Sequence, residues 1–438
     1  MPGGTWTSQN KVRPGVYINF VGEANATGTL GERGIVSLPL ALSWGPAKQV
    51  IAVEAGADTF DTLGYPITAP QLLLVREALK RARTLLLYRL NTGTPATATI
   101  GDLTVTAKYG GVRGNDISIR VQTNIDDTSK FDVETLVDGA VIDTQTVSTI
   151  EELKPNDWVT WSGTGAPTAT AGTPLTGGAD GTPSAQDYLD YLSAIEVYDF
   201  NTIGLTATDA TTKGVFVSFA KRLRDDEGKR IQVVVENYPT ADYEGVISVK
   251  NGVVLSDGTT LTAAQAVAWV AGATAGAAAN QSLTYVAYDD AVDVAPKYTN
   301  SQIIAALQAG EFLFTPMNGV AVVEKDINTL HSFTPTKGQP FSKNRVIRVL
   351  DGLGNDFLRV FSASYIGKVS NNADGRNLFK AECINIIGQY QNMGAVQNFD
   401  AQSDLEVLPG IETDTVVVNV WLQPVDSIEK IYMTVTVR

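Results

Sequence analysis

The single histidine of the chain, His331, is the first residue to test for chemistry, because an enzyme that used an imidazole base here would have to use this one. It lies in DINTLHSFTP, and the chain contains neither the G-x-S-x-G turn of serine hydrolases nor the H-E-x-x-H helix of zinc proteases. One histidine and one cysteine, Cys383, are too few for a metal site built on those residues. We therefore predict no catalytic residue and no metal site, and interpret His331 as an ordinary polar residue.

Glycines and carboxylates offer two other kinds of binding site, and neither has the spacing that its chemistry needs. Gly110, Gly111 and Gly114 lack the G-x-G-x-x-G spacing of a phosphate loop, and a strand pattern follows them where a helix should begin. A turn before a strand is the favoured interpretation. The acidic clusters lack the ligand spacing of an EF-hand and are interpreted as solvated loops. They lie at 126–127, 225–227 and 289–290. We predict no cofactor.

The composition excludes several classes of partner. Lysine and arginine number 33 against 47 aspartate and glutamate residues, and this acidic balance argues against nucleic acid as the main partner. The single cysteine fits synthesis in a reducing compartment, and we expect no secretory signal. The most apolar stretch, 261–279, is rich in alanine and glycine and carries Gln265, so we predict no membrane span.

Helix and strand patterns alternate on both sides of a different region. Apolar runs at 34–42 and 84–90 flank a helical stripe at 69–83, which indicates a β-α-β unit buried on both faces. Short alternating strands between 94 and 183 are typical of a small antiparallel β-domain, whose last part, 163–183, is interpreted as a flexible exit linker. The alternation then resumes. The expected helices are 184–195, 211–224, 262–280 and 301–309, and the expected strands are 201–206, 231–236, 283–288, 312–315 and 320–324. One sequence cannot show whether the two α/β portions share a sheet.

The last hundred or so residues change character again. A long helical pattern at 339–369, with breaks at Gly352 and Gly354 as an option, precedes a second helix at 376–391 and a strand at 415–422. Between residues 337 and 380 there are eight basic residues and three acidic ones. A solvated helix face and a docking surface for an acidic partner explain this excess about equally well.

The final ten residues, EKIYMTVTVR, have the period of a strand with one buried face. Ile431, Met433, Val435 and Val437 alternate with more polar residues, and no later segment folds back to cover the edge. Such a strand must join its own domain's sheet or reach into a neighbouring subunit. A second short strand pattern, 15–20, follows a polar segment near the N-terminus. These two ends suggest a protein that is linked to its neighbours.

Several separated stretches, in one order along most of the chain, resemble a known family. They are RPGVYINF, RGIVSLPLALSWGP, KYGGVRGNDISI, AWVAGATAGAAANQSLTY, INTLHSF through FSKNRVIRVLDGLGNDF, YIGKVSNNADGR and QPVDSIEKIYMTVTV. In these stretches the chain is similar to the tail sheath proteins of contractile phage tails and of phage-tail-like bacteriocins, in the type found in Gram-positive bacteria and their prophages. Each piece alone is weak, whereas the combination is specific.

The resemblance implies an α/β fold with an inserted antiparallel β-sandwich domain and an α+β C-terminal domain. The central layer would be subtilisin-like in shape only, because His331 lacks the context of a catalytic triad. The expected divisions are a linking arm and strand at 1–22, an α/β segment at 23–93, the sandwich at 94–183, the central domain at 184–331 and a tube-facing domain at 332–438.

The resemblance also implies a function: a structural subunit that stacks as hexameric rings around a tail tube and contracts to drive the tube through a bacterial envelope. The expected partners are further copies of the chain, the tail tube protein, and baseplate and tail terminator proteins, without nucleic acid or membrane. Linking strands would be traded between neighbours through Val16, Tyr17, Ile18, Phe20, Ile431, Met433, Val435 and Val437. The candidate tube contacts are Lys343, Arg345, Arg348, Lys368, Arg376 and Lys380.

Two other functions stay open at this point. An α/β hydrolase-like enzyme with an accessory β-domain would need a nucleophile and base, and a cell-surface binding module would need a secretory signal. As a sheath subunit, the protein would be made in the bacterial cytoplasm and would end in the tail of a phage or phage-like particle.

Overall fold

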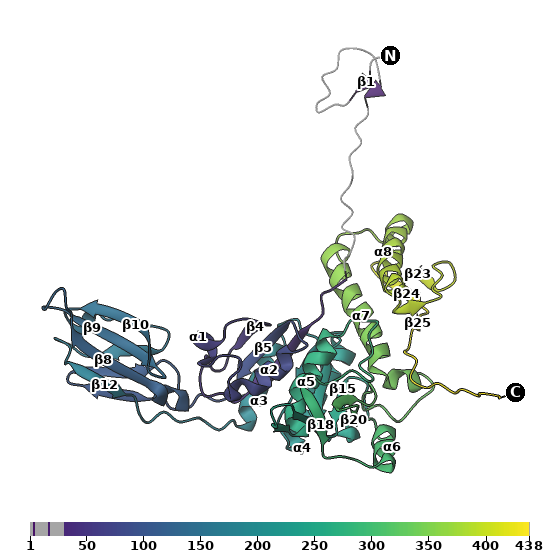
Figure 1. The fold of residues 1–438 in the computed structure, drawn as a ribbon. Helices are drawn as coiled ribbons and strands as arrows, with labels where there is room; N and C mark the ends of the chain where they lie inside the picture. Colours follow the sequence, from purple (N-terminus) through teal and green to yellow (C-terminus); the bar gives the residue numbers. More distant parts are fainter. Residues whose placement is uncertain (1–2, 5–15, 18–29, 438) are drawn as a thin grey trace.

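The structure, a computed structural model, describes residues 3–4, 16–17 and 30–437. Figure 1 shows a β-sandwich at one end, a central α/β body, and a C-terminal lobe of two long helices with short hairpins. Near the N-terminus, β1 (Gly3–Gly4) and β2 (Val16–Tyr17) pair in parallel.

One seven-stranded sheet forms the middle of the body. Its strands lie in the order β19-β15-β14-β13-β3-β5-β4, and every pairing is parallel except that of β4 with β5. The strands are β3 (Ile35–Leu40), β4 (Val50–Glu54), β5 (Thr84–Arg89), β13 (Thr202–Gly204), β14 (Gln232–Glu236), β15 (Val246–Val249) and β19 (Glu311–Phe312). Because β13 pairs with β3, the chain before the sandwich and the chain after it share this sheet.

Helices cover both faces of the sheet, as the continuous apolar strands predict. Alternate residues of β5 enter two cores: Leu85 and Leu87 pack with α5, and Leu86 and Tyr88 pack with α3 and α4. The helices of the body are α1 (Phe60–Leu63), α2 (Leu73–Leu79), α3 (Ala185–Ile195), α4 (Ala210–Lys221), α5 (Ala263–Gly276) and α6 (Asn300–Gln308). Small sheets beside them use β16 (Gly252–Leu255), β17 (Thr260–Leu261), β18 (Ala291–Ala295), β20 (Phe314–Met317) and β21 (Val320–Val323).

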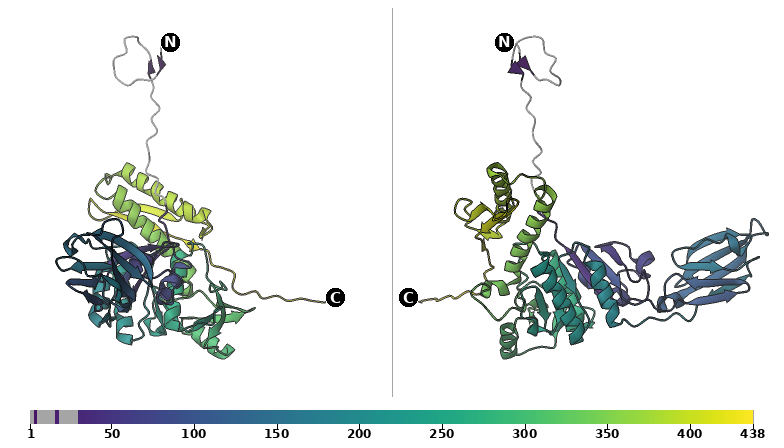
Figure 2. Two further views of the ribbon diagram at one scale, coloured as in Figure 1. Left: turned by 60° about the vertical axis from the view of Figure 1, so that its left-hand side comes forward. Right: turned by 180° about the vertical axis from the view of Figure 1, so that it is seen from behind.

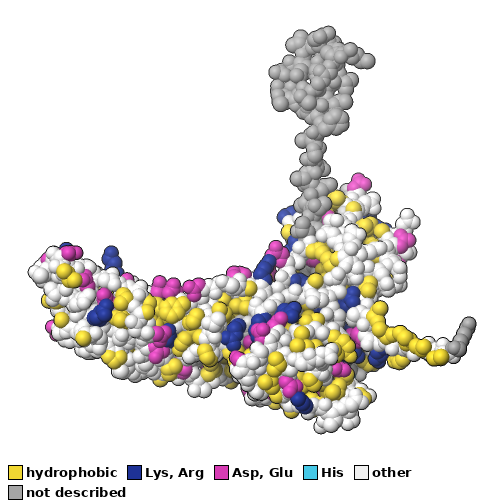
Figure 3. Space-filling view, viewed as in Figure 1, with side chains coloured by type: hydrophobic (Ala, Val, Ile, Leu, Met, Phe, Trp, Pro, Cys, Tyr) yellow, Lys and Arg dark blue, Asp and Glu magenta, His cyan; other side chains and the backbone are white. Residues whose placement is uncertain are grey.

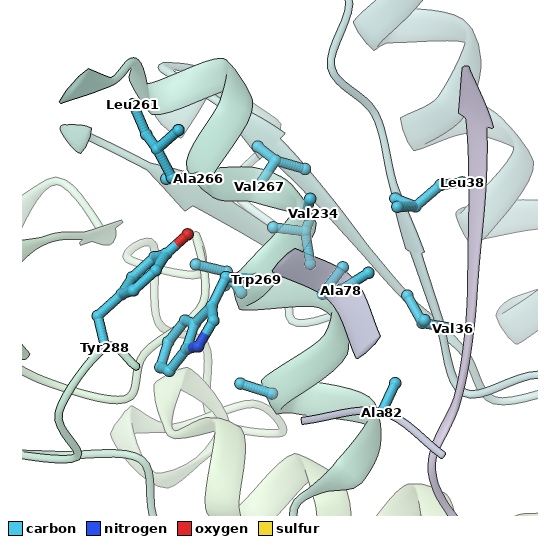
Figure 4. Packing of buried hydrophobic residues seen from close by; sticks show 14 of the residues in the cluster. Val36, Leu38, Ala78, Ala82, Val234, Leu261, Ala266, Val267, Trp269 and Tyr288 are labelled. Atoms are coloured by element: carbon cyan, nitrogen blue, oxygen red, sulfur yellow. The ribbon is translucent and has the colours of Figure 1, made fainter. Parts of the chain in front are cut away.

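Residues 283–288, which the sequence predicts as a strand, form turns instead. Ala287 makes only an isolated bridge to Val322. Tyr288 is buried by stacking on Trp269, with 4.5 Å between the ring centroids (Figure 4). Packing in the main core therefore buries Leu283 and Tyr288 without strand pairing.

Helix α5 touches α2 without intervening side chains. A Cβ atom added to Gly272 would lie 2.2 Å from the carbonyl oxygen of Ala78, and one added to Gly276 would lie 1.9 Å from that of Arg81. Figure 4 shows Ala78 and Ala82 facing this helix among the buried side chains of the main core. The Gly272 and Gly276 spacing thus serves close packing inside the body.

We expect Gly272→Ala to destabilise the protein by about 1–3 kcal/mol, because the new methyl group would overlap backbone. In an unobstructed helix the same change stabilises by roughly 1 kcal/mol. Gly388 in α8 (Ala373–Asn392) provides the control, since nothing lies within 4 Å of its added Cβ. Urea unfolding of both variants checks this. Equal effects of the two substitutions would contradict the close contact.

The sandwich consists of a four-stranded sheet, β10-β9-β8-β12, and a three-stranded sheet, β11-β7-β6, with antiparallel pairings throughout. Its strands are β6 (Thr97–Ile100), β7 (Leu103–Ala107), β8 (Ile117–Thr123), β9 (Phe131–Val137), β10 (Ala140–Val147), β11 (Val159–Ser162) and β12 (Thr170–Pro174). The flexible linker expected at 163–183 is wrong, because β12 pairs with β8 and Leu175 is fully buried. Backbone pairing orders this Gly- and Thr-rich segment.

A buried joint fixes the sandwich to the body. Trp44 of the body stacks on Trp158 of the sandwich, with 4.9 Å between the ring centroids. Arg113 is buried beside them and donates hydrogen bonds to the Gly64 carbonyl at 2.7 Å and to both carboxylate oxygens of Asp138. Stacking and charge-assisted hydrogen bonds leave little freedom between the two parts.

The C-terminal lobe is built on α7 (Asn344–Ser364) and α8. Helix α7 is shorter than the expected 339–369 and runs unbroken through Gly352 and Gly354. The neighbouring Val349 and Leu353 are buried against α8, and this packing offsets the cost of the two glycines. Two small antiparallel sheets complete the lobe. One is the hairpin of β23 (Leu405–Pro409) with β24 (Val416–Val420), and the other pairs β22 (Val396–Gln397) with β25 (Gln423–Pro424) on either side of that hairpin in the chain.

Buried ionic groups join α7 to the body. Arg224 at the end of α4 makes two hydrogen bonds to Asp351 of α7, at 2.6 and 2.8 Å, and both side chains are almost fully buried. Burial alone would lower the pKa of Arg224, but the charge and hydrogen bonds of Asp351 raise it above its ordinary value. The guanidinium and the carboxylate therefore depend on each other for charge compensation.

Candidate functional site

The end of the chain divides at Glu429 into two parts, which we name the tail root, residues 425–429, and the linking segment, residues 430–437. Beyond β25 the described residues belong to no strand. The apolar residues of the linking segment are solvent-exposed, from 76% for Val435 to 90% for Val437. Figure 2 shows the segment projecting from the body, and Figure 3 shows hydrophobic side chains along it. A strand over Ile431–Val437 is absent from the described subunit, whose own sheets leave these residues unpaired.

The hairpin β23–β24 presents a strand edge of complementary character. Only these two strands form the sheet, and Val416, Val417 and Trp421 are exposed on it or directly after it. The charged residues of the hairpin are all acidic: Glu406, Glu412 and Asp414. Residues 430–438, by contrast, begin and end with basic residues, Lys430 and Arg438. Unpaired backbone with exposed valines is a template for a further strand.

An apolar cavity of about 330 Å³ lies beside the start of β24. Phe361 and Tyr365 from α7 and Phe379 from α8 line it, with 4.2 Å between the ring centroids of Phe361 and Phe379. Asn371 donates two hydrogen bonds of 2.9 Å to the carbonyls of Thr413 and Thr415 and so holds the hairpin against the helices. The cavity is suited to a bulky apolar side chain.

The structure separates the six candidate tube contacts. Arg348 is buried, bonds the Gln281 carbonyl and lies 3.4 Å from Asp326, while Lys343 is buried and paired with Glu429. These two predictions are wrong for the folded subunit, because both charges are already compensated inside it. Lys368 is exposed, and the remaining three are partly exposed: Arg345, Arg376 and Lys380.

The N-terminal candidates are only partly covered. Val16 and Tyr17 form β2, whose backbone pairs with Gly3 and Gly4. Ile18 and Phe20 lie outside the described residues.

The residues considered for chemistry are not brought together. His331 is exposed, and its ring lies 3.3 Å from Asp242 and 2.8 Å from the Thr329 carbonyl. Burial raises the pKa of the Cys383 thiol to about 12, which leaves it protonated and unreactive at neutral pH. Among the described residues no group of three histidine, cysteine or carboxylate side chains could hold a metal ion.

The glycines proposed as a turn have that role. Gly111, at φ 140°, leads into a short 3₁₀ turn and then β8, and a Cβ on it would lie 2.0 Å from the Ser43 carbonyl oxygen. This close approach leaves no room for a phosphate.

Four family descriptions match consecutive parts of the chain. They are "Tail sheath protein Gp18 domain III N-terminal region" over 33–90, "Phage tail sheath protein beta-sandwich domain" over 91–180, "Phage tail sheath protein central domain" over 181–329 and "Phage tail sheath C-terminal domain" over 336–438. The crystal structure of a sheath tail protein from Desulfitobacterium hafniense is 65% identical, with a TM-score of 0.90, over 96% of this chain and 99% of that one. This chain belongs to the phage tail sheath family.

Other relatives of this sheath chain support the same family. A sheath tail protein from Listeria innocua is 40% identical, with a TM-score of 0.79, over 93% of this chain and 96% of that one. The phage-like element PBSX protein XkdK of Bacillus subtilis is 40% identical over the full length of both chains. The helical sheath of the anti-feeding prophage in its contracted state, at 12% identity and a TM-score of 0.60 over 97% of this chain and 99% of that one, shares the fold.

Membership of this family makes the chain a structural protein of a contractile tail of the phage or prophage type. The α/β architecture with an inserted β-sandwich also agrees with the sequence prediction. Across the described ranges, no helix combines the length and hydropathy needed to cross a membrane.

Sequence reasoning missed two parts of this site in the sheath chain: strand β23 and the partners of Glu429. Strand β23 carries the alternation LEVLP before Gly410 and could have been found by its period. The partners of Glu429, namely Lys343 and Thr284, lie 86 and 145 residues away in the chain, and no local pattern announces them.

Proposed function

We propose that this sheath subunit polymerises as stacked hexameric rings around a tail tube and contracts to drive the tube through a bacterial envelope. The observation that carries the proposal is the exposed, unpaired and alternating linking segment, which one subunit cannot bury. Exposed apolar residues of this kind mark a surface that another molecule covers. In a polymer, the backbone of a neighbour can pair with the segment without depending on individual side chains.

The proposed acceptor is the β23–β24 hairpin of a second copy. A third strand there would cover Val416 and Val417, and the acidic residues of the hairpin would face the basic ends of the tail. We propose the second linking strand at Val16, Tyr17, Ile18 and Phe20. Links at both ends would let rigid subunits rotate and slide while staying joined.

The tube would dock at the α7–α8 turn. Lys368, Arg376 and Lys380 gather at this end of the lobe, and Ile366 and Leu378 beside them are 70% and 51% exposed. Arg345 lies at the other end of α7 and remains a weaker candidate. A surface of mixed basic and apolar character fits an acidic partner through steering and burial together.

Other parts of the proposal rest on the family alone. They are the contacts with baseplate and tail terminator proteins, the subtilisin-like shape of the central layer, synthesis in the bacterial cytoplasm, and the domain divisions at 22, 93, 183 and 331. A hydrolase would need a nucleophile held by its base, whereas the described contacts of the His331 ring are to Asp242 and to the Thr329 carbonyl, neither of which is a hydroxyl or thiol nucleophile.

Electron microscopy of the purified full-length protein tests this function. We expect rings or tubes that appear above a threshold concentration, because each added subunit buries apolar surface that is exposed in the monomer. A protein that stays monomeric at every concentration and salt condition would contradict the proposal.

A further inference from the structure

The tail root is fastened to the body of its own subunit. The amide of Val425 donates to the Ala395 carbonyl at 2.9 Å. The carboxylate of Glu429 then accepts a hydrogen bond from the Thr284 hydroxyl at 3.0 Å and pairs with the ammonium group of Lys343. Asp426 lies 3.4 Å from the same ammonium group. Three separate parts of the chain therefore meet at this point: the tail, the start of α7 and the loop after α5.

This contact is shielded from water. The side chains of Glu429 and Lys343 are only 11% and 10% exposed, so solvent and salt screen the pair much less than they screen a surface pair. The hydroxyl of Thr284 is itself held in place, since it accepts a hydrogen bond of 3.0 Å from the amide of Asp326. The receiving site is thus built into the body independently of the tail.

Charge balance explains why a carboxylate is needed here. The ammonium groups of Lys325, Lys343 and Lys430 lie around the tail root, and the carboxylates facing them are those of Asp426 and Glu429. Burial and the charge of Lys343 lower the pKa of Lys325, which shows how crowded with positive charge the site is. Removing Glu429 would leave three cations against a single carboxylate.

The contacts that hold the tail to its own subunit end after this residue. Glu429 is held on two sides, whereas Ile431 is 77% exposed and Tyr432 is 91% exposed. Across the described residues, the linking segment makes no hydrogen bond or ion pair with the rest of the subunit. The boundary between the fixed and the free chain therefore falls at one side chain.

We propose that Glu429 is a positioning residue: it fixes the point and direction from which the linking segment leaves the subunit, and ties that segment to the central body through Lys343 and Thr284. This inference rests on the proposed strand linkage and adds to it. Force on the linking segment is therefore transmitted directly to the junction between α7 and the body, and not through the β23–β24 hairpin of the same subunit. When fully extended, the eight described residues of the linking segment span roughly 26 Å at about 3.3 Å per residue.

Release of Glu429 has a defined cost for assembly. Residues 426–429 would join the free part of the tail, and about four more residues would have to be ordered whenever the segment docks on a neighbour. The longer tether would also lower the effective concentration of the segment at its acceptor.

Trypsin cleavage of the dilute, unassembled full-length subunit tests the positioning role. The bond after Lys430 lies next to Glu429, and cleavage there releases IYMTVTVR, which mass spectrometry detects. We expect Glu429→Ala to speed the release of this peptide at least tenfold, because the protease needs several extended residues on both sides of the bond and the tail root now opens freely. Asp126→Ala, which removes an exposed carboxylate from the turn between β8 and β9 of the sandwich, should leave the rate unchanged.

Assembly supplies the second readout. We expect Glu429→Ala to raise the concentration needed for tubes at least tenfold, and the exchanged pair Lys343→Glu with Glu429→Lys to recover most of this assembly effect. Trypsin is not applied to the exchanged pair, because a lysine at position 429 adds a cleavage site. A merely structural loss would lower the thermal midpoint of the unassembled subunit, whereas a loss of positioning alone would leave it unchanged.

Wild-type rates of cleavage and assembly for Glu429→Ala would overturn the positioning role. If deletion of residues 430–438 still blocked assembly in that case, the proposed strand linkage would stand. Normal assembly of that deletion would instead overturn the strand linkage, and the trypsin experiment would still judge whether Glu429 holds the tail root.

Discussion

Deletion of residues 430–438 is expected to give a folded subunit that no longer forms tubes. The described part of this stretch contributes no hydrogen bond or ion pair to its own subunit, so the thermal midpoint should not change. Its loss removes four alternating apolar side chains from each link, each worth about 1.5–3 kcal/mol when fully buried. Sedimentation and electron microscopy, at concentrations where the wild-type protein forms tubes, measure the effect.

Two point substitutions make this experiment specific for a strand with one buried face. Val435→Asp places a charge on the apolar face and should block assembly almost as completely as the deletion. Thr436→Asp places the same charge on the opposite face and should be tolerated. Equal behaviour of the two variants would show that the segment docks in some form other than a strand, and tubes formed by the deletion variant would remove it from the linkage altogether.

The substitution Asp351→Asn is expected to lower the free energy of unfolding by about 3–5 kcal/mol, the largest stability effect that we foresee. It leaves the guanidinium of Arg224, of which only 1% is exposed, without its counter-charge. The pair joins α4 to α7, so the loss should also loosen the C-terminal lobe from the body. Urea unfolding of the unassembled subunit and hydrogen exchange of α7 check both consequences.

An exposed pair two residues away provides the control. Arg222 and Glu196 are 42% and 35% exposed, and Glu196→Gln should cost no more than about 1 kcal/mol. The double variant Arg224→Met with Asp351→Leu should regain most of the stability, because it removes both buried charges together. A small effect of Asp351→Asn, similar to that of Glu196→Gln, would contradict the dependence of the two groups on each other.

These contacts divide the subunit into fixed and free parts. The sandwich is held by Arg113 and the stacked tryptophans, and α7 is held by Arg224 and Asp351. The linking segment alone leaves the described body without a partner of its own chain. A subunit of this kind can keep its internal packing while its position relative to a neighbour changes.

Local patterns identified most of the helices and strands, because the period of apolar residues depends on neighbours a few positions away. The prediction of a strand at 283–288 was wrong for the same reason, because an apolar run cannot distinguish pairing with a strand from packing against α5. The Gly- and Thr-rich segment 163–183 failed in the opposite direction, since its composition hides β12, which is ordered by pairing with β8. Composition indicates how flexible a segment is in the unfolded chain, but it does not show which strand the segment pairs with in the fold.

The sequence by itself determined the family, the acidic balance, the insertion of a β-domain and the alternating apolar pattern of the final residues, because each of these depends on neighbouring residues or on a specific order of motifs. Only the tertiary structure decided that both α/β portions share one sheet, that Arg348 and Lys343 face inward, and that Glu429 separates the tail root from the linking segment. The physical reason is that burial and charge compensation depend on which distant groups meet. A lysine in a basic stretch has the same sequence signature whether it reaches a partner protein or a carboxylate 86 residues further along its own chain.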